Sequence, residues 1–395
     1  MVRIYLDYAA ATPVAPEVLR TMQPYFLEKF GNPGSLHSFG QAAQAAVDRA
    51  RETIARALGA QFRKIIFTGS ATEANNLALR GATAAGMKRV IVSAVEHESV
   101  LETARSLKKA GVEVVELPVD KDGVVKLPAL GKALIAGPAL ISILYANNET
   151  GTIQPIAKIS KMVHAAGGIL HTDAVQALQF LDCRGDTLGA DLMTVSGHKI
   201  YGPKGVGALY VRGKGPGSRA KNHAHPTPYS LSPIIAGGGQ EFGLRSGTEN
   251  VPLIVGLAAA VEYIEKDKAK YARQIAAMKE QIVRGIKKIY PRAQLNGGKN
   301  SLPHIANVWI PGVLAQDLLI QLDLAGIAVS AGSACTARSS QPSHVLRAMG
   351  LSESRAKQSI RVSLGRPTTN AEATKLLKVL SSLRRQKAGN NFPSH

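Results

Sequence analysis

Short apolar runs alternate with longer segments of helical spacing between Ile65 and Val211. The runs have the length of strands and lie at 65–67, 89–94, 112–117, 139–145, 169–172, 191–196 and 205–211. Between several of them apolar residues recur every three or four positions, as at 72–85, 99–110 and 157–166. Strands separated by helices predict βαβ units. The predicted fold class is therefore α/β, with a mostly parallel seven-stranded sheet in a large domain.

Helical patterns also flank this region. Apolar residues fall on one face over 41–58, as in an amphipathic helix. A longer pattern over 251–290 predicts one helix that crosses from the large domain into a smaller one, and Pro291 ends it. The remaining chain mixes helices with short strands at 305–309, 327–330 and 359–364. This mixture predicts a smaller α+β C-terminal domain.

The length of 395 residues is more than one ordinary domain needs. We predict a large domain at 13–255, a small domain formed by 1–12 and 256–385, and a flexible tail at 386–395. The segment 213–233, rich in Gly, Pro, His and Lys, is predicted to be an exposed basic loop. Its histidines, His223 and His225, have no acidic or cysteine neighbours in the loop, so no metal site is predicted.

Composition indicates a folded protein outside the membrane. Hydrophobic residues make up 45% of the chain, and the longest apolar run, Ala139–Ala146, is far shorter than the roughly 18 residues of a membrane helix. An acid, Asp7, lies where a signal peptide would have its apolar core. Two cysteines are too few for a disulfide framework in a chain of this length. We therefore expect a cytoplasmic protein in a reducing compartment.

The two cysteines lie in different contexts. Cys183 lies in a connecting segment and is expected to be a small buried hydrophobe. Cys335 lies in Ser-Ala-Gly-Ser-Ala-Cys-Thr, where little bulk is present to bury it. This run of small residues favours an accessible thiol at Cys335.

The formal net charge of +20 allows two explanations. Such a charge attracts anionic partners, and it is explained equally well by a solvated basic surface. Long blocks of like charge are absent from the sequence, and aromatic residues, at 5%, are too sparse for a base-stacking platform. A nucleic-acid partner is therefore not favoured.

Polar motifs follow the predicted strands, where ligands of open α/β sheets collect. The first, Thr-Gly-Ser-Ala-Thr-Glu at 68–73, joins a strand to a helix. Its backbone N–H groups and the hydroxyls of Ser70 and Thr72 could receive a phosphate, or Ser70 and Thr72 could simply cap the helix. The motif is neither a dinucleotide fingerprint nor a Walker loop, so no nucleotide is predicted.

Two further motifs complete the picture. Asp173 follows the strand at 169–172, where it could pair with a protonated ring nitrogen or cap the next helix. Lys199 follows the strand at 191–196 and is flanked by Ser196 and His198. A lysine at such a place is either solvated or able to bond an aldehyde cofactor. A phosphate cradle, a ring acid and a lysine at one sheet edge together indicate pyridoxal phosphate.

These motifs belong to a longer series, through which the chain resembles the cysteine desulfurases of the NifS/IscS type. Those proteins are fold-type-I pyridoxal-phosphate enzymes related to class V aminotransferases. The resemblance extends from Tyr5 to about Thr369. It is carried, in order, by the motifs at 5–13, 31–35, 71–76, 96–97, 147–151, 171–176, 196–199, 245–248, 333–336 and 360–364.

The resemblance implies roles for the matched residues. The catalytic residues would be Lys199, which holds the cofactor, Cys335, which accepts sulfur, and His97, which stacks on the cofactor ring. Further contacts with the cofactor would come from Ala71, Thr72, Asn148, Asp173, Gln176, Ser196, His198 and, across a homodimer interface, Thr248. The substrate would be bound by Asn148 and Arg361, since a guanidinium group suits a carboxylate.

The reaction implied by the resemblance converts L-cysteine to L-alanine. Cys335 would become a persulfide and pass its sulfur to an acceptor protein, such as an iron–sulfur scaffold. The small residues around Cys335 favour a loop that moves during this transfer. The alternatives are a selenocysteine lyase, a class V aminotransferase, and a protein of this fold that only binds partners.

Overall fold

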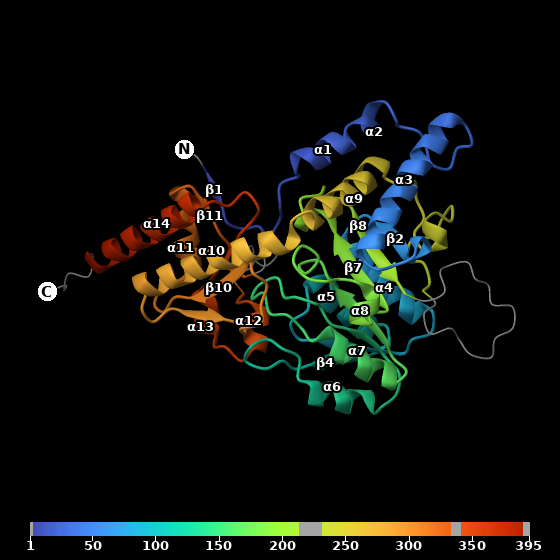
Figure 1. Ribbon diagram of the computed structural model, residues 1–395. Helices are drawn as coiled ribbons and strands as arrows, with labels where there is room; N and C mark the ends of the chain where they lie inside the picture. Colours follow the sequence, from blue (N-terminus) through green and yellow to red (C-terminus); the bar gives the residue numbers. More distant parts are fainter. Residues whose placement is uncertain (1–2, 213–230, 333–340, 390–395) are drawn as a thin grey trace.

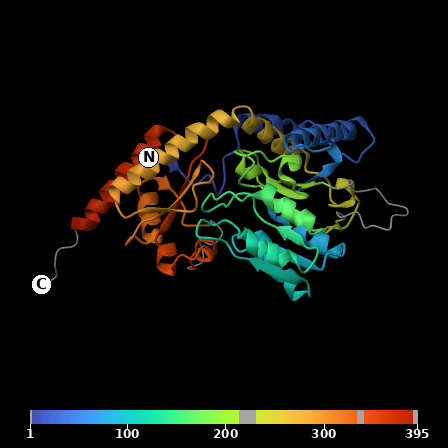
Figure 2. The same cartoon turned by 60° about the horizontal axis from the view of Figure 1, so that its bottom comes forward.

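The computed structural model describes residues 3–212, 231–332 and 341–389. The chain forms a large α/β domain and a smaller C-terminal domain that lie side by side (Figure 1). The long helix α10 (Lys268–Ile289) leads from the first domain along the second. Figure 2 shows the same arrangement after a rotation.

The large domain is built on a seven-stranded sheet with the strand order β2-β8-β7-β6-β5-β3-β4. Strand β8 runs antiparallel to both of its neighbours, and the other pairs are parallel. The predicted mostly parallel sheet is confirmed. Its strands are β2 (Ile65–Thr68), β3 (Arg89–Ser93), β4 (Glu113–Leu117), β5 (Leu140–Ser142), β6 (Ile169–Asp173), β7 (Leu192–Ser196) and β8 (Gly207–Val211).

Both faces of this sheet are covered by helices. Helices α4 (Ala71–Ala84) and α5 (Glu98–Lys109) pack on one face, and α3 (Ser38–Ala57), α6 (Leu127–Leu134), α7 (Ile156–Ala165) and α9 (Val251–Glu265) belong to the core of the other. Successive strand residues, such as Ile65 and Ile66, point into opposite cores because side chains alternate along a strand. Burial on both faces explains the nearly continuous apolar runs in the sequence. The short helices are α1 (Pro16–Met22), α2 (Pro24–Leu27) and α8 (Gly185–Leu188).

The C-terminal domain contains a three-stranded antiparallel sheet with β10 between β12 and β9. The first strand of the chain pairs with this domain, because β1 lies parallel to β11. Among the described residues, no helix is both long and apolar enough to cross a membrane. The elements are β1 (Ile4–Tyr5), β9 (Gln294–Asn296), β10 (Ile305–Trp309), β11 (Ile327–Ala328), β12 (Ser359–Ser363), α11 (Ala315–Leu324), α12 (His344–Ala348), α13 (Glu353–Lys357) and α14 (Asn370–Gly389).

The single helix predicted over 251–290 is wrong. The structure has two helices there, since α9 ends at Glu265 and α10 begins at Lys268. Asp267 between them has a φ of −135°, outside the helical range. Aspartate favours a helix start over a helix interior, because its side chain competes for backbone hydrogen bonds. The strand predicted at 139–145 is also shorter, and β5 ends at Ser142.

A buried ion pair anchors the loop that precedes α9. Both side chains are almost fully buried, and the guanidinium of Arg51 donates to the two carboxylate oxygens of Glu241 at 2.6 and 2.7 Å. Glu241 also accepts the backbone N–H of Phe67 at 2.8 Å. Glu241 and Phe242 have positive φ values, 49° and 59°, which non-glycine residues rarely adopt. The ion pair therefore holds a strained turn against β2.

We expect Arg51→Ala to destabilise the protein by about 3–5 kcal/mol, because it leaves the Glu241 carboxylate buried without its partner. Urea unfolding measures the loss. The control is Arg184→Ala, which removes a pair between the exposed side chains of Arg184 and Asp182 and should cost about 0–1 kcal/mol. Equal losses in the two variants would contradict this account of the turn.

Candidate active site

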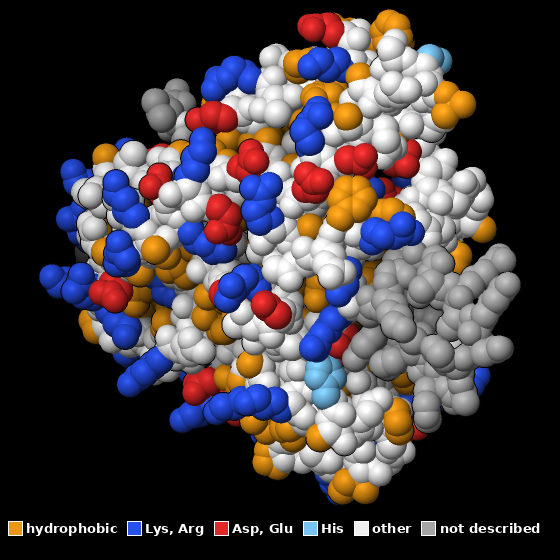
Figure 3. Space-filling model, turned by 45° about the vertical axis from the view of Figure 1, so that its right-hand side comes forward, with side chains coloured by type: hydrophobic (Ala, Val, Ile, Leu, Met, Phe, Trp, Pro, Cys, Tyr) orange, Lys and Arg blue, Asp and Glu red, His pale blue; other side chains and the backbone are white. Residues whose placement is uncertain are grey.

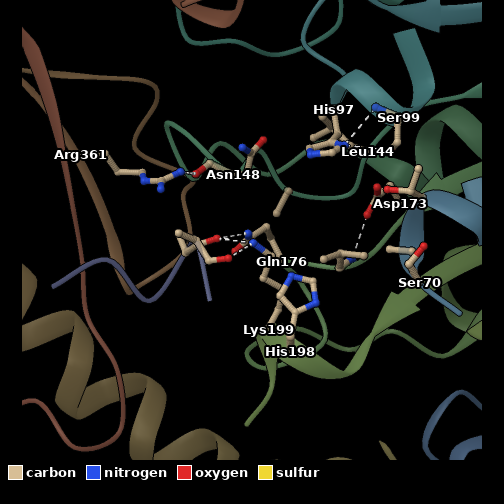
Figure 4. Close-up of a pocket in the computed structure, with 16 residues that line it drawn as sticks. Ser70, His97, Ser99, Leu144, Asn148, Asp173, Gln176, His198, Lys199 and Arg361 are labelled. Atoms are coloured by element: carbon tan, nitrogen blue, oxygen red, sulfur yellow. Dashed lines mark hydrogen bonds between the residues drawn. The ribbon is translucent and has the colours of Figure 1, made fainter. Parts of the chain in front are cut away.

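The carboxyl ends of the parallel strands meet the C-terminal domain at a cavity of about 250 Å³. Figure 4 shows side chains from both domains pointing into it. The cavity brings together most of the residues that the sequence singles out. It is lined by Ala9, Ala10, Ser70, Ala71, Thr72, His97, Ser99, Leu144, Ala146, Asn148, Asp173, Val175, Gln176, His198, Lys199 and Arg361.

Asp173, the last residue of β6, is buried and held at both carboxylate oxygens. Oδ2 accepts from Nδ2 of Asn75 at 2.9 Å, and Oδ1 accepts from the backbone N–H of Val175 at 3.0 Å. The alternative role of Asp173 as a cap is thus present in part, because one oxygen does bind the backbone of the next turn. The carboxylate nevertheless lines the cavity.

His97 lies at the start of α5 and caps that helix. Its Nδ1 is 3.1 Å from the backbone nitrogen of Ser99 and 2.8 Å from Ser99 Oγ. These contacts fix the plane of the imidazole ring along one wall of the cavity (Figure 4). A ring held in this way can stack on a planar ligand.

Lys199 reaches the cavity from the short helical turn after β7. Its Nζ donates to the backbone carbonyl oxygens of Ala9 and Ala10 at 2.7 and 2.5 Å. Gln176 Nε2 donates to the same Ala9 carbonyl at 2.9 Å. The segment that follows β1 therefore forms a wall of the cavity and holds the lysine amine in place.

The N-terminus of α4 forms the end of the cavity opposite Arg361, where Ser70, Ala71 and Thr72 line it. Ser70 Oγ accepts from the backbone N–H of Glu73 at 3.1 Å, so the capping role does exist. Backbone N–H groups at a helix N-terminus also favour an anion. Burial, then the nearby Lys199, Lys204 and His97, lower the pKa of His198 to about 4. His198 is therefore neutral near pH 7.

Arg361, on β12, closes the cavity from the C-terminal domain. Its side chain is about 1% exposed, and Nη2 forms an ion pair with Asp7 Oδ1 at 2.8 Å. Nη1 donates to the backbone carbonyl of Asn148 at 2.8 Å. Arg361 Nε has no hydrogen-bond partner among the described residues. Nε is itself buried, but Nη1 and Nη2 each carry a second N–H, so the guanidinium keeps donor capacity for a carboxylate in the cavity.

Two of the described candidates lie away from the cavity lining. Ser196 is buried, and its Oγ lies 2.9 Å from Nδ1 of His198, which does line the cavity. Thr248 lines a separate shallow pocket with residues 29–33. Cys335 lies outside the described residues, as do 213–230 of the predicted basic loop. Cys183 is buried as expected, and burial raises the pKa of its thiol to about 12.

Sequence reasoning missed several contributors to the site. Asn75 and Ser99 hold Asp173 and His97, and the Ala9 and Ala10 carbonyls hold Lys199. Asn75 could have been noticed as a polar residue on the apolar face of its helix. Ala9 and Ala10 offered no signal, because their backbone oxygens make the contact and the partner is 190 and 189 residues away.

Comparison with known proteins agrees with this geometry. Residues 4–376 match the family described as aminotransferase class-V. The chain belongs to that family. It is 42% identical over 384 residues to the cysteine desulfurase IscS of Dictyoglomus turgidum, covering 96% of this chain and 94% of that protein.

Solved structures of this family superpose on the chain over nearly its full length. A NifS-like protein, 34% identical, matches with a TM-score of 0.87 over 98% of this chain and all of that one. The structure titled SspA in complex with cysteine, 39% identical, matches with a TM-score of 0.78 over 91% of this chain and 98% of that one. These matches confirm the resemblance inferred from the motifs.

Pyridoxal phosphate is the cofactor of this family, and the residues of the cavity fit it. An amine, a carboxylate with both oxygens held by donors, an imidazole ring and a helix N-terminus line one cavity. The amine suits the aldehyde of the cofactor, and the carboxylate suits its pyridine nitrogen. The imidazole suits its aromatic ring, and the helix N-terminus suits its phosphate. The residues that could hold the cofactor are thus those that line the cavity at its large-domain side.

A carboxyl group with an altered proton affinity lies behind His97. Glu96 is completely buried, and its Oε1 accepts from Ser93 Oγ at 2.5 Å and from the backbone N–H of Leu144 at 2.9 Å. Burial raises the pKa of Glu96 from 4.5 to about 8, and the nearby Asp173 adds a smaller increase. Glu96 is therefore protonated in the folded protein near pH 7.

Glu96 should make the protein less stable as pH rises. Between pH 4.5 and about 8 the folded state keeps a proton that the unfolded state has lost, so this contribution is complete below pH 4.5 and lost above pH 8. We expect Glu96→Gln to flatten the pH dependence of urea unfolding between pH 4.5 and about 8. Glu102→Gln, an exposed change on the following helix α5, should keep the wild-type slope. An unchanged slope in Glu96→Gln would show that this carboxyl does not titrate in that range.

Proposed function

We propose that this protein is a pyridoxal-phosphate-dependent cysteine desulfurase, which converts L-cysteine to L-alanine and transfers the sulfur to Cys335. The observation that carries the proposal is the meeting of Lys199, Asp173 and Arg361 in one cavity built from both domains. Full-length relatives named cysteine desulfurase support it. A protein that only binds partners would lack some of the site residues. Here each described site position carries the residue that the motifs predict.

The cofactor would be held by residues of the large domain. Lys199 Nζ is the amine for its aldehyde, Asp173 the partner of its ring nitrogen, and His97 the ring that stacks on it. Ala71, Thr72 and His198 lie where the phosphate would bind, with Ser196 orienting His198. When bound, the cofactor supplies an electron sink that stabilises negative charge at the Cα atom of the substrate.

The substrate carboxylate would bind Arg361, whose side chain lines the cavity and pairs with Asp7 in this structure. Asn148 lines the cavity beside Arg361 and would contact both substrate and cofactor. The related SspA structure, described as a complex with cysteine, supports this substrate class. Lys199 Nζ would accept the proton from the Cα atom, since it already lies among the groups that line the cavity.

Connectivity of the chain supports Cys335 as the sulfur acceptor. On the N-terminal side, Ser330 exchanges backbone hydrogen bonds with Arg361 at 2.6 and 3.1 Å. On the C-terminal side, His344 Nε2 lies 3.0 Å from the backbone oxygen of Glu96, next to His97. The described residues on both sides of the segment that carries Cys335 thus lie beside the cavity. The Cys335 sulfur would bond the substrate sulfur as the Cβ–S bond of cysteine breaks.

The proposal predicts the products of the purified protein with L-cysteine. We expect alanine in equal amount to the sulfur released in the presence of a thiol reductant, and a sulfur adduct on the peptide that contains Cys335. Cys335→Ser should lower turnover by about a hundredfold or more, the usual loss when a nucleophile is removed. Cys183→Ser is the matched control and should retain activity. A keto acid product would indicate an aminotransferase. Activity with selenocysteine but not with cysteine would indicate a selenocysteine lyase.

We also propose a homodimer formed through the N-terminal helices. Large apolar side chains are exposed along this segment: Leu19, Phe26, Leu27, Phe30, Leu36 and Phe39. A group of exposed apolar residues of this size marks a protein interface. Thr248 lines a shallow pocket beside Phe30 and Pro33, on this same surface. In a two-fold dimer Thr248 would therefore be delivered to the cofactor phosphate of the partner subunit.

A mixed dimer tests this arrangement. Thr248→Ala and Lys199→Ala should each lower activity as homodimers. In a dimer with one subunit of each kind, the site that retains Lys199 receives an intact Thr248 from its partner. We therefore expect co-expression of differently tagged variants to yield about half of the wild-type activity after tandem purification. Activity no higher than that of the Thr248→Ala homodimer would contradict delivery across the interface.

The sulfur acceptor is proposed to be an acidic protein, such as an iron–sulfur scaffold. Residues 266–389 hold 21 Lys and Arg but only 6 Asp and Glu, and they include Cys335. Figure 3 shows one face of the molecule, on which Lys and Arg side chains are spread among fewer acidic ones. This excess of basic residues in the part of the sequence that contains Cys335 would accelerate the approach of an acidic partner. We propose the cytoplasm as the compartment, because the thiol of Cys335 must stay reduced.

A further inference from the structure

Two residues behind the cavity wall, Asn75 and Ser99, connect Asp173 with His97. Asn75 lies on α4 and is completely buried, and Ser99 lies in the first turn of α5. Asn75 Nδ2 is 2.9 Å from Asp173 Oδ2 and 2.8 Å from Ser99 Oγ. Ser99 Oγ lies 2.8 Å from His97 Nδ1. Figure 4 shows the last of these contacts at the edge of the cavity. Four side chains thus form one chain of hydrogen bonds.

The chemistry of the groups gives this chain a direction. A carboxylate has only acceptors, so the atom of Asn75 that faces Asp173 is its amide nitrogen. The second hydrogen of that nitrogen points to Ser99 Oγ, which accepts it. The hydroxyl hydrogen of Ser99 is then directed to His97 Nδ1. The backbone N–H of Ser99 donates to the same nitrogen at 3.1 Å.

A ring nitrogen that receives two donors cannot carry a hydrogen of its own. Nδ1 of His97 is therefore an acceptor, and the neutral imidazole carries its hydrogen on Nε2. A histidine fixed in this tautomer can donate from Nε2 but takes up no proton at Nδ1. Ser99 imposes this constraint mainly through its hydroxyl, which makes the shorter contact at 2.8 Å and is oriented by Asn75. The longer backbone contact at 3.1 Å adds to it.

An unmet hydrogen bond indicates that the orientation of Asn75 is imposed by Asp173. The side-chain oxygen of Asn75 is buried and has no hydrogen-bond partner among the described residues. Such an oxygen costs free energy. Rotating the amide would not remove the problem, because it would place that oxygen against the Asp173 carboxylate.

We propose that Asn75 and Ser99 are positioning residues for the reaction. Asn75 and the Val175 N–H fix the two oxygens of Asp173, and Ser99 holds His97 as the Nε2–H tautomer. The reaction for which these residues are positioned is the desulfurase reaction, so this part of the proposal rests on the proposed function. The hydrogen bonds themselves belong to the protein and can be tested without turnover.

The first test reads the tautomer. Full-length protein is prepared with isotope-labelled histidine, and the ring nitrogens of His97 are assigned by comparison with His97→Gln. We expect one hydrogen-bearing and one bare ring nitrogen in the wild type. Ser99→Ala should shift both signals toward intermediate values, because the hydroxyl donor is lost and both tautomers become populated. Ser99→Thr keeps the hydroxyl and should restore the wild-type spectrum.

The second test measures turnover. Ser99→Ala and Asn75→Ala should lower kcat by roughly tenfold, about the contribution of one such hydrogen bond, with little change in KM for cysteine. Ser99→Thr should recover most of this loss. The matched control is Asn76→Ala, next along α4. Among the described residues, its side chain donates to the backbone carbonyl of Thr72 and accepts from Nε of Arg80, both on its own helix. Its kcat should be unchanged. Ser99→Ala carries the test if Asn75→Ala fails to fold, since it removes a single oxygen atom.

The outcomes separate this inference from the proposed function. Mixed tautomers of His97 in the wild type, or a single tautomer retained in Ser99→Ala, would overturn the positioning role even if alanine is produced. A single tautomer that is lost in Ser99→Ala and restored in Ser99→Thr would support it even if cysteine is not the substrate. Absence of alanine from the wild type would count against the desulfurase proposal alone.

Discussion

Burial of both faces of the seven-stranded sheet is the constraint from which the site follows. Side chains within the strands must be apolar or fully hydrogen-bonded, because helices cover them on either side. His171 in the middle of β6 satisfies this rule through Ser142 and Thr194, and burial lowers its pKa to about 4. Groups that bind a ligand are left to the strand ends. Six of the seven strands end at the same edge, which gathers polar side chains from distant parts of the sequence.

The C-terminal domain completes this edge. Arg361 enters the cavity from β12, while Asp7 and the Ala9 and Ala10 carbonyls come from the segment after β1. The first strand pairs with β11, so the two ends of the chain share one domain. Thr12 continues the connection to the large domain by accepting the backbone N–H of Tyr201 at 2.7 Å. The cavity is thus a product of the contact between domains.

The fold and the polar residues at strand ends could be predicted because their signals are local. Apolar runs locate the strands, and Asp173 and Lys199 each follow one directly. The helix break at Asp267 was missed, because an apolar helix and an amphipathic one join without proline or glycine between them. Asn75 and Ser99 were missed for a different reason. Their contacts depend on how α4, α5 and β6 pack, and spacing along one helix contains no information on that. The role of Cys335 stays a prediction from its motif.

The segment between β1 and α1 mechanically links the two ends of the cavity. Asp7 forms an ion pair with Arg361 in one domain. Two and three residues later, the backbone carbonyls of Ala9 and Ala10 accept hydrogen bonds from Lys199 in the other domain. The residues between these contacts form one turn, in which the backbone N–H of Ala10 donates to the carbonyl oxygen of Asp7 at 2.9 Å. The spacing between the guanidinium of Arg361 and the amine of Lys199 therefore depends on the shape of a single turn, which belongs to neither the sheet nor the helices.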